Sequence, residues 1–428
     1  MNKFKRALAA IAASAVMLTM TGCSDTRYAM TYNNTEKVNA GIYIYNLYSE
    51  LSYQMTMAYY MSGAAELDFD QEIEGKKMSE YLADKARTAT KECMAVTAKF
   101  KELGLELTDE ETSQINDDVK SIWNSSSGLL EAEGISKDSI RQVVTADKMR
   151  TKLFDYFYST DGVEAVTDDD MKKYVEDNFI RYKAIRITKS DAEDDATKES
   201  ENKENEQIRD EFLAKAEGYD YDSFDEIIAE YDEYAKAKLE AETSAEEDST
   251  DDGSVDVVGD SGPVAPGAEM EEVEDLDDMV LDESELVNDD GTVVDINDLL
   301  SSDEDGTGDD TNPNETMFNF GELDEEGKAS ITGKLADFVK GIDINKAAAY
   351  EDDSFYYVIM KGDVSENSAD YASKNRDNLL QTMKGDDFQS KIDSWVEDMK
   401  FSENSDAIKK FTAKVVYDKQ AEYYESLQ

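Results

Sequence analysis

The sequence predicts an α+β protein in which a mainly helical domain is joined to a small antiparallel sheet. Long stretches repeat apolar residues every three or four positions, as amphipathic helices do. Two other regions, Tyr182–Thr188 and 347–362, have the alternation and the aromatic content of strands. These strands lie with a few helices between two helical regions, which favours α+β over a regular α/β order.

The N-terminus has the pattern of a secretory signal. Lys3, Lys5 and Arg6 form a basic lead, and Ala7–Met20 is uncharged and almost wholly apolar or small. This run is shorter than the roughly 20 apolar residues that span a bilayer. Because small residues follow it, the run is typical of a signal peptide, which we expect at 1–22.

The residues Met20–Cys23 resemble a bacterial lipobox, although a lipobox usually has Leu where Met20 stands. The resemblance implies that Cys23 is acylated and anchors the mature chain to the outer face of the bacterial cell membrane. Ordinary secretion with an incidental cysteine is the alternative. Residues 23–37 are then expected to form a membrane tether.

Cysteine and histidine chemistry is largely excluded. Apart from Cys23, Cys93 is the single cysteine of the mature chain, so it cannot form an internal disulfide. Its amphipathic helical surroundings indicate a small core residue. The chain has no histidine, which excludes His-based triads and imidazole zinc sites. We expect no metal site and no cofactor.

Charge is concentrated in one segment of the 428-residue chain, whose formal charge is -56. Leu239–Gly327 contains 33 Asp and Glu, no Lys or Arg, and all three prolines. Such a composition cannot offset chain entropy, so we expect 239–316 to be a disordered acidic insertion. The overall charge repels nucleic acid and anionic lipid head groups, so we expect neither as a partner.

One stretch of this insertion, Asn288–Leu300, resembles half of a calcium-binding loop. Such a loop has Gly at its sixth position and oxygen ligands at the first and twelfth. With Gly291 sixth, these two positions are Leu286 and Asn297. We therefore expect no specific calcium site, and only loose cation association by the acidic segment.

The first predicted helix, Val38–Met61, is apolar around most of its surface, so we expect it to be largely buried. The alternative is an adaptable Met and Tyr surface that binds unfolded chains. The candidate residues for that surface are Tyr43, Tyr45, Tyr48, Met55 and Met57.

Caps and breaks define the helices that follow. Lys77–Leu103 is predicted to end at Gly104, because glycine readily adopts the positive φ of a helix C-terminus. Thr108 and Glu111 are spaced as a capping box that starts the next helix. A break is expected at Ser125–Gly128. The following helix has an apolar stripe of Ile140, Val143, Val144, Met149, Leu153 and Phe157.

A second helical and strand region begins after this. Thr167 and Asp170 repeat the capping pattern before a helix that runs into the strand Tyr182–Thr188. Short helices are predicted at 207–217 and 221–235.

Structure is expected to resume after the acidic insertion. Leu335, Phe338 and Val339 mark a short helix. The two strands of 347–362 are joined by an acidic turn at Glu351–Asp353. The chain ends in helices at about 369–400 and 406–424.

Several stretches, taken in order, resemble the parvulin-type foldases, which include PrsA-like lipoproteins and SurA-like periplasmic chaperones. They are Ala98–Glu111, Gly134–Gln142, Val166–Ile187, Tyr221–Tyr231 and Asp353–Asp363. The resemblance implies four parts beside the insertion. They are a helical chaperone domain at 38–165, the halves of a parvulin-like domain at 166–238 and 317–365, and C-terminal helices at 366–428 that pack on the first domain.

The sequence departs from the family at the isomerase site. Active members place His near the start of the first strand and again in the last strand, where Arg186 and Tyr356 stand here. Phe224 and Phe338 match aromatic positions of the core or proline pocket. Rotation about a prolyl bond has a barrier of about 18–20 kcal/mol, and lowering it requires a pre-organised polar network. We therefore expect a degenerate domain with weak or absent activity.

The resemblance implies a lipid-anchored extracytoplasmic chaperone that binds unfolded or nascent secreted polypeptides without covalent chemistry. The binding surface is expected in an apolar groove between the N-terminal and C-terminal helices. One alternative is an active peptidyl-prolyl isomerase that uses residues other than His. Another is a non-catalytic surface scaffold lipoprotein whose function resides in the acidic insertion.

Overall fold

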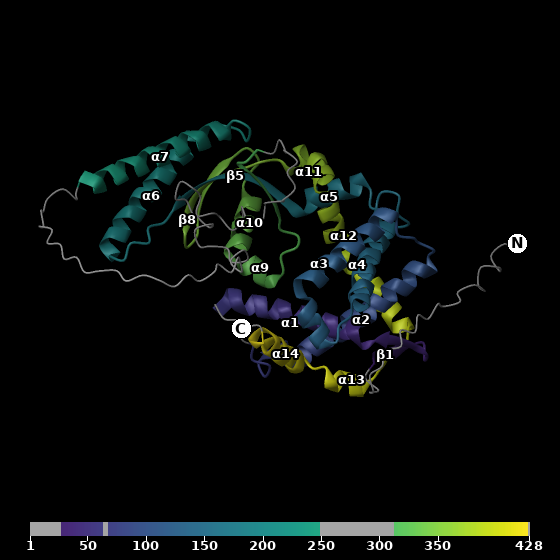
Figure 1. Cartoon of the computed structure of the whole chain (residues 1–428). Helices are drawn as coiled ribbons and strands as arrows, with labels where there is room; N and C mark the ends of the chain where they lie inside the picture. Colours follow the sequence, from purple (N-terminus) through teal and green to yellow (C-terminus); the bar gives the residue numbers. More distant parts are fainter. Residues whose placement is uncertain (1–26, 63–66, 249–311, 427–428) are drawn as a thin grey trace, which may run out of the picture. The chain divides into compact units, whose positions relative to one another are not determined.

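The computed structural model describes residues 27–62, 67–248 and 312–426 (Figure 1). The fold is mainly helical with small antiparallel sheets, which confirms the predicted α+β class. The chain divides into two compact units. The helical unit is Met1–Met171 with Ala372–Gln428, and the sheet unit is Lys172–Tyr371. The expected signal peptide 1–22 and Cys23 lie outside the described residues.

The helical unit combines helices from both parts of the chain. They are α1 (Ala40–Ser62), α2 (Met78–Glu102), α3 (Asp109–Glu133), α4 (Lys137–Tyr158), α12 (Arg376–Asp398), α13 (Ser405–Lys410) and α14 (Ala413–Glu425). Helix α1 packs against α2, α4 and α14, and α12 packs against α2 and α4. The C-terminal helices therefore complete a core that the N-terminal helices begin. Helices α5 (Asp168–Asn178) and α11 (Ser368–Lys374) contain the two boundaries between the units.

The predicted caps are present in the structure. Thr108 Oγ1 accepts from the backbone N–H of Glu111 at 3.1 Å, and Glu111 Oε2 accepts from the N–H of Thr108 at 2.7 Å. Gly104 has φ +69, as its place after α2 requires. The predicted break at Ser125–Gly128 is a kink inside α3, where Ser126 alone has non-helical angles.

The expected tether is wrong for the residues that the structure describes. β1 (Tyr28–Tyr32) and β2 (Glu36–Asn39) form a hairpin, and β1 also pairs with β9 (Ser402–Glu403). Ala29 and Met30 of β1 are fully buried, in two neighbouring core clusters. Because these side chains have a core to enter, the segment folds instead of extending as a spacer.

The core of the helical unit forms around the inner side of α1. Tyr43, Leu47 and Leu51 follow at intervals of four residues and are fully buried. Ile408 and Val416 of the C-terminal helices belong to the same cluster. Cys93 lies in a neighbouring cluster, and burial raises the pKa of its thiol to about 12. This confirms Cys93 as a core residue. A short hairpin of β3 (Glu72–Ile73) and β4 (Lys76–Lys77) precedes α2.

The sheet unit contains a four-stranded antiparallel sheet of order β6-β5-β8-β7. The strands are β5 (Phe179–Thr188), β6 (Glu315–Asn319), β7 (Ala347–Glu351) and β8 (Phe355–Lys361). The helices are α6 (Asp195–Lys215), α7 (Phe224–Asp248), α9 (Glu325–Ala329), α10 (Ile331–Gly341) and the 3₁₀ turn η2 (Val364–Glu366). β5, β7 and β8 were predicted, and β6 was not.

Helices cover the two faces of this sheet. Phe212 of α6 and Phe224 of α7 pack with Ile187 on one face, which we call the α7 face. Ala336 and Val339 of α10 pack with Ile359 and other residues on the opposite face, the α10 face.

The expected bounds of the acidic insertion, 239–316, are wrong at both ends. α7 continues to Asp248, and β6 already begins at Glu315. Residues 249–311, which include the calcium-loop candidate Asn288–Leu300, lie outside the described residues.

Polar contacts hold the strand that follows the insertion. Arg181 Nη2 lies 2.8 Å from Glu315 Oε2, and the hydroxyl of Tyr221 donates to the same oxygen at 3.1 Å. Asn312 and Asn314 donate to the carboxylate of Asp225 at the start of α7. Arg181 offsets the charge of Glu315, so an acidic composition does not prevent order here.

Candidate functional site

The outer side of α1 carries an uncovered row of large side chains. Tyr45, Ser49, Tyr53 and Met57 follow at intervals of four residues, and Tyr60 comes three residues later, so all five lie on one side of the helix. We call this row the α1 stripe. Tyr53, Met57 and Tyr60 have relative exposures of 59%, 39% and 69%. The helix is therefore core on one side and an open aromatic surface on the other.

Further tyrosines extend this surface. The ring of Tyr48 stacks on that of Tyr45 with centroids 6.5 Å apart, and Tyr59 lies edge-on to Tyr60 at 6.2 Å. Helix α14 lies beside α1 (Figure 1), and its exposed Tyr424 is close enough to Tyr48 to interact electrostatically. Burial and Tyr48 together raise the pKa of Tyr424.

The client-binding candidates of α1 divide between its two sides. Tyr43 is fully buried, so its candidacy is wrong: it cannot touch a partner while the core is intact. Tyr45, Tyr48 and Met55 are half-buried against the same core. Tyr45 and Met57 belong to the α1 stripe.

The sequence interpretation missed Tyr53 and Tyr60, the two most exposed residues of the stripe. Their spacing from Tyr45 and Met57 was the available signal. Steps of four from Tyr45 reach Tyr53 and then Met57, and a step of three reaches Tyr60.

The α1 stripe is uncharged but has acidic neighbours. Glu50 is the single charged residue in α1. Glu422 and Glu425 are exposed in the last turns of α14, on either side of Tyr424. The basic residue of these turns, Lys419, lies 3.7 Å from the buried Glu133.

Arg186 and Tyr356 do not form a common site. Arg186 of β5 pairs with Tyr357 of β8, and Ile187 pairs with Tyr356. Cross-strand partners point to the same face of a sheet, and successive residues point to opposite faces. Arg186 therefore shares the α10 face with Tyr357, whereas Tyr356 lies on the α7 face.

The tyrosines of β8 make contacts within the sheet unit itself. The Tyr356 ring is buried with Lys189 Nζ 4.6 Å from its centroid, and burial raises the pKa of its hydroxyl. On the other face, the hydroxyl of Tyr357 donates to Asp352 Oδ2 at 2.8 Å. Burial, and then this carboxylate, raise the pKa of Tyr357.

The two pocket candidates also lie apart. Phe224 is fully buried on the α7 face, and Phe338 packs against Tyr350 on the α10 face with centroids 4.8 Å apart. Both are core residues of the sheet unit, as one reading of the resemblance implied. Because the sheet separates them, they cannot line one proline pocket.

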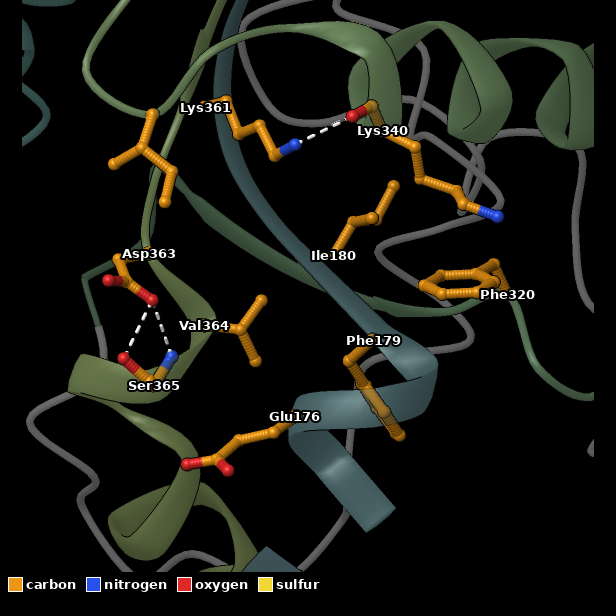
Figure 2. Close-up of a pocket in the computed structure, with 10 residues that line it drawn as sticks. Glu176, Phe179, Ile180, Phe320, Lys340, Lys361, Asp363, Val364 and Ser365 are labelled. Carbon is orange, nitrogen blue, oxygen red and sulfur yellow. Dashed lines mark hydrogen bonds between the residues drawn. The ribbon is translucent and has the colours of Figure 1, made fainter. Parts of the chain in front are cut away.

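A shallow pocket of about 390 Å³ lies at the opposite end of β5 from Arg186. Phe179, Ile180 and Phe320 form its apolar lining (Figure 2). Lys361 Nζ donates to the carbonyl oxygens of Lys340 and Ile342, and burial lowers its pKa.

Asp363, another polar residue of this pocket, is also hydrogen-bonded. Asp363 accepts from the backbone N–H and the hydroxyl of Ser365, as Figure 2 shows. Lys361 and Asp363 thus bond to the backbone and side chains of the loops that form the pocket.

Comparisons with known proteins give no family. No protein-family model matches the chain, and no curated protein matches it. Within the described ranges, no helix is long and apolar enough to cross a membrane. The same residues contain no group of three or more Cys, Asp or Glu side chains placed to hold a metal ion.

Proposed function

We propose that the protein is a lipid-anchored extracytoplasmic chaperone that binds unfolded secreted polypeptides, with weak or absent prolyl isomerase activity. The observation that carries the proposal is the α1 stripe. Large exposed side chains such as Tyr53 and Tyr60 gather on one helix, in a chain whose surface is otherwise rich in charge. Grouped apolar surface of this kind marks interaction sites in soluble domains.

The strength expected of this surface suits transient holding. Covering two tyrosine rings and a methionine removes on the order of 200 Å² of apolar surface from water. At about 25 cal/mol per Å², this contributes about 5 kcal/mol before the entropic costs of binding. Flexible Met57 and the amphipathic tyrosines can adapt to many sequences. Affinity is therefore expected to be modest and tolerant of sequence.

The placement of Arg186 and Tyr356 supports a binding function over isomerisation. The two side chains point to opposite faces of the sheet, so they cannot act together on one peptide bond. The alternative of a His-free isomerase would have to combine groups that share one face, such as Arg186 and Tyr357 on the α10 face.

The proposal is tested by suppression of aggregation of a reduced, unfolded secreted protein, followed by light scattering. The chain from Ser24 onward contains every described residue and is used without its lipid. We expect the wild type to suppress scattering and the double variant Tyr53→Ser/Tyr60→Ser to lose most of this effect. Tyr234→Ser removes a tyrosine of 39% exposure from α7 and is the matched control. A wild type without any effect on scattering would refute the proposal.

Prolyl isomerisation is measured on the same samples with a protease-coupled peptide assay. We expect the rate of the uncatalysed reaction. Acceleration that Arg186→Ala abolishes, with circular dichroism unchanged, would instead support the isomerase alternative.

The proposed anchor is tested in bacterial cells with a labelled fatty acid. We expect the wild type to incorporate the label and to sediment with membranes. Cys23→Ser should do neither. Incorporation of the label by Cys23→Ser would contradict lipidation at this residue.

A further inference from the structure

The charged residues of α1 and of the last turns of α14 are mainly acidic. The stripe itself is neutral, and Glu50 is the single charge on its helix. Glu422 and Glu425 border Tyr424 on the neighbouring α14. Lys419, one turn before Glu422, offsets part of this charge and donates to the carbonyl oxygen of Ala132. Glu50, Glu422 and Glu425 outnumber Lys419, so a partner on this surface meets an apolar centre with a net acidic border.

The aromatic rings of the stripe are open to cations. A lysine or arginine over a ring face is attracted by the ring quadrupole. In the described parts of the chain this contact is common elsewhere, as with Lys37 over Tyr28 and Lys85 over Tyr81. Among the described residues, no cation of the chain occupies a ring of the stripe.

The charge of the whole chain acts in the same direction. A formal charge of -56 attracts cationic chains and repels anionic ones, including a second copy of this protein. Anionic lipid head groups are repelled for the same reason. Charge complementarity thus selects one kind of occupant.

We propose that the α1 stripe binds polypeptide segments in which apolar side chains alternate with lysine or arginine. This inference rests on the proposed function and names the client class of the same surface. Apolar side chains of the client cover Met57 and the edges of the rings. Its cations lie over the faces of Tyr53 and Tyr60 and near the carboxylates of Glu50, Glu422 and Glu425.

Three fluorescent peptides of equal length and equal apolar content provide the test, with Lys, Ser or Glu at the alternate positions. Binding to the chain from Ser24 onward is measured by fluorescence anisotropy. We expect affinity to fall in the order Lys, Ser, Glu, with a roughly tenfold difference between the first and the last at low salt. High salt should reduce the difference, because the Debye length falls from about 10 Å at 0.1 M to about 3 Å at 1 M.

Two variants separate this surface from the general charge of the chain. Glu50→Gln/Glu422→Gln/Glu425→Gln should lower the preference for the Lys peptide at least about twofold and leave the Ser peptide unaffected. Glu106→Gln, at an exposed carboxylate in the turn between α2 and α3, should change neither.

The possible results distinguish the inference from the function. Equal affinity of wild type for all three peptides, with binding lost in Tyr53→Ser/Tyr60→Ser, would overturn the cationic client class and keep the chaperone surface. A Lys preference that the triple variant retains in full would overturn the assigned border. Binding that Tyr53→Ser/Tyr60→Ser leaves unchanged would overturn the role of the stripe, and the proposed function with it.

Discussion

Single residues of α1 show how one side chain type serves two purposes. Tyr43 is fully buried, and its hydroxyl has no hydrogen-bond partner in the described structure. Burial raises the pKa of this hydroxyl to about 12. Tyr53 exposes its ring and leaves its hydroxyl in water. The buried tyrosine contributes to packing, and the exposed one is available to a partner.

Tyr43→Phe should therefore keep or increase stability. The change preserves the ring and removes a buried hydroxyl without a partner. Leaving such a group unpaired costs about 1 kcal/mol of stability. Tyr43→Ala should cost about 3–5 kcal/mol because it leaves a cavity. Urea unfolding followed by circular dichroism measures both. As a control, Tyr53→Phe should lie within about 0.5 kcal/mol of wild type. A large loss in Tyr43→Phe would mean that the hydroxyl has a partner after all.

Glu133 should make stability depend on pH. Its side chain is buried in α3, neither carboxylate oxygen has a hydrogen bond in the described structure, and Lys419 is 3.7 Å away. Burial, partly opposed by Lys419, raises the pKa of Glu133 to about 7. The neutral form is thus favoured in the folded state. The stability that the folded state gains from the neutral carboxyl is complete below the unfolded pKa of about 4.5 and is lost as pH rises through about 7.

The comparison that measures this effect is wild type against Glu133→Gln, which keeps the shape and cannot ionise. Between pH 4.5 and 8, the unfolding free energy of wild type should fall relative to the variant by up to about 3 kcal/mol. Parallel pH profiles for the two proteins would show that Glu133 does not titrate in this range.

At the scale of helices and strands, the sequence predicts those features that depend on contacts between residues close together in the chain. The capping box of Thr108 and Glu111 spans one helical turn, and it forms as expected. β6 was missed because the residues that hold it in place are distant in the sequence. Arg181, which binds Glu315, is 134 residues away.

The candidate site was only partly predictable for a similar reason. Tyr45 and Met57 were chosen, but their helical neighbour Tyr53 was not. The placement of Arg186 and Tyr356 on opposite faces depends on the register of β5 and β8. The pattern of either strand alone does not contain that register.

The ends of the acidic insertion lead to a prediction on deletions. Replacing 249–311 by a short Gly-Ser linker should leave cooperative unfolding and chaperone activity intact, because every described contact remains. Deleting 239–316 should destabilise the sheet unit, since it removes Glu315 and the asparagines that bind Asp225. Urea unfolding and light scattering are the measurements. Loss of activity in the shorter deletion, with the fold intact, would favour the scaffold alternative.

Glu315 alone should carry much of this effect. It is 14% exposed and bound by Arg181, so Glu315→Ala leaves a largely buried guanidinium paired with the exposed carboxylate of Glu366 at 3.3 Å. We expect a loss of about 3 kcal/mol in urea unfolding. Glu322→Ala, at the end of the same strand region, is the control and should cost less than about 1 kcal/mol. Equal effects of the two changes would argue against the role given to Glu315.

At the scale of the whole molecule, the helical unit depends on both parts of the chain. Ile408, Ala413 and Val416 lie in the same core as Tyr43 and Leu47. A chain that stops at Tyr371 should therefore lose the fold of the helical unit and its chaperone activity, while Lys172–Tyr371 alone stays folded. Hydrogen exchange on the two shortened chains measures this. Protected amides in α1 of the shortened chain would contradict the expectation.

The pairing of β1 with β9 has a consequence for how the protein is made. Asn404 Nδ2 donates to the carbonyl oxygen of Tyr28, across 376 positions of the sequence. Ribosomes add about 5–20 residues each second. The first strand therefore waits on the order of 20–75 seconds for its partner, while the sheet unit between them can already close. The core of the helical unit can therefore be completed only after Ile408 and Val416 have been made, and until then its apolar residues are open to proteases.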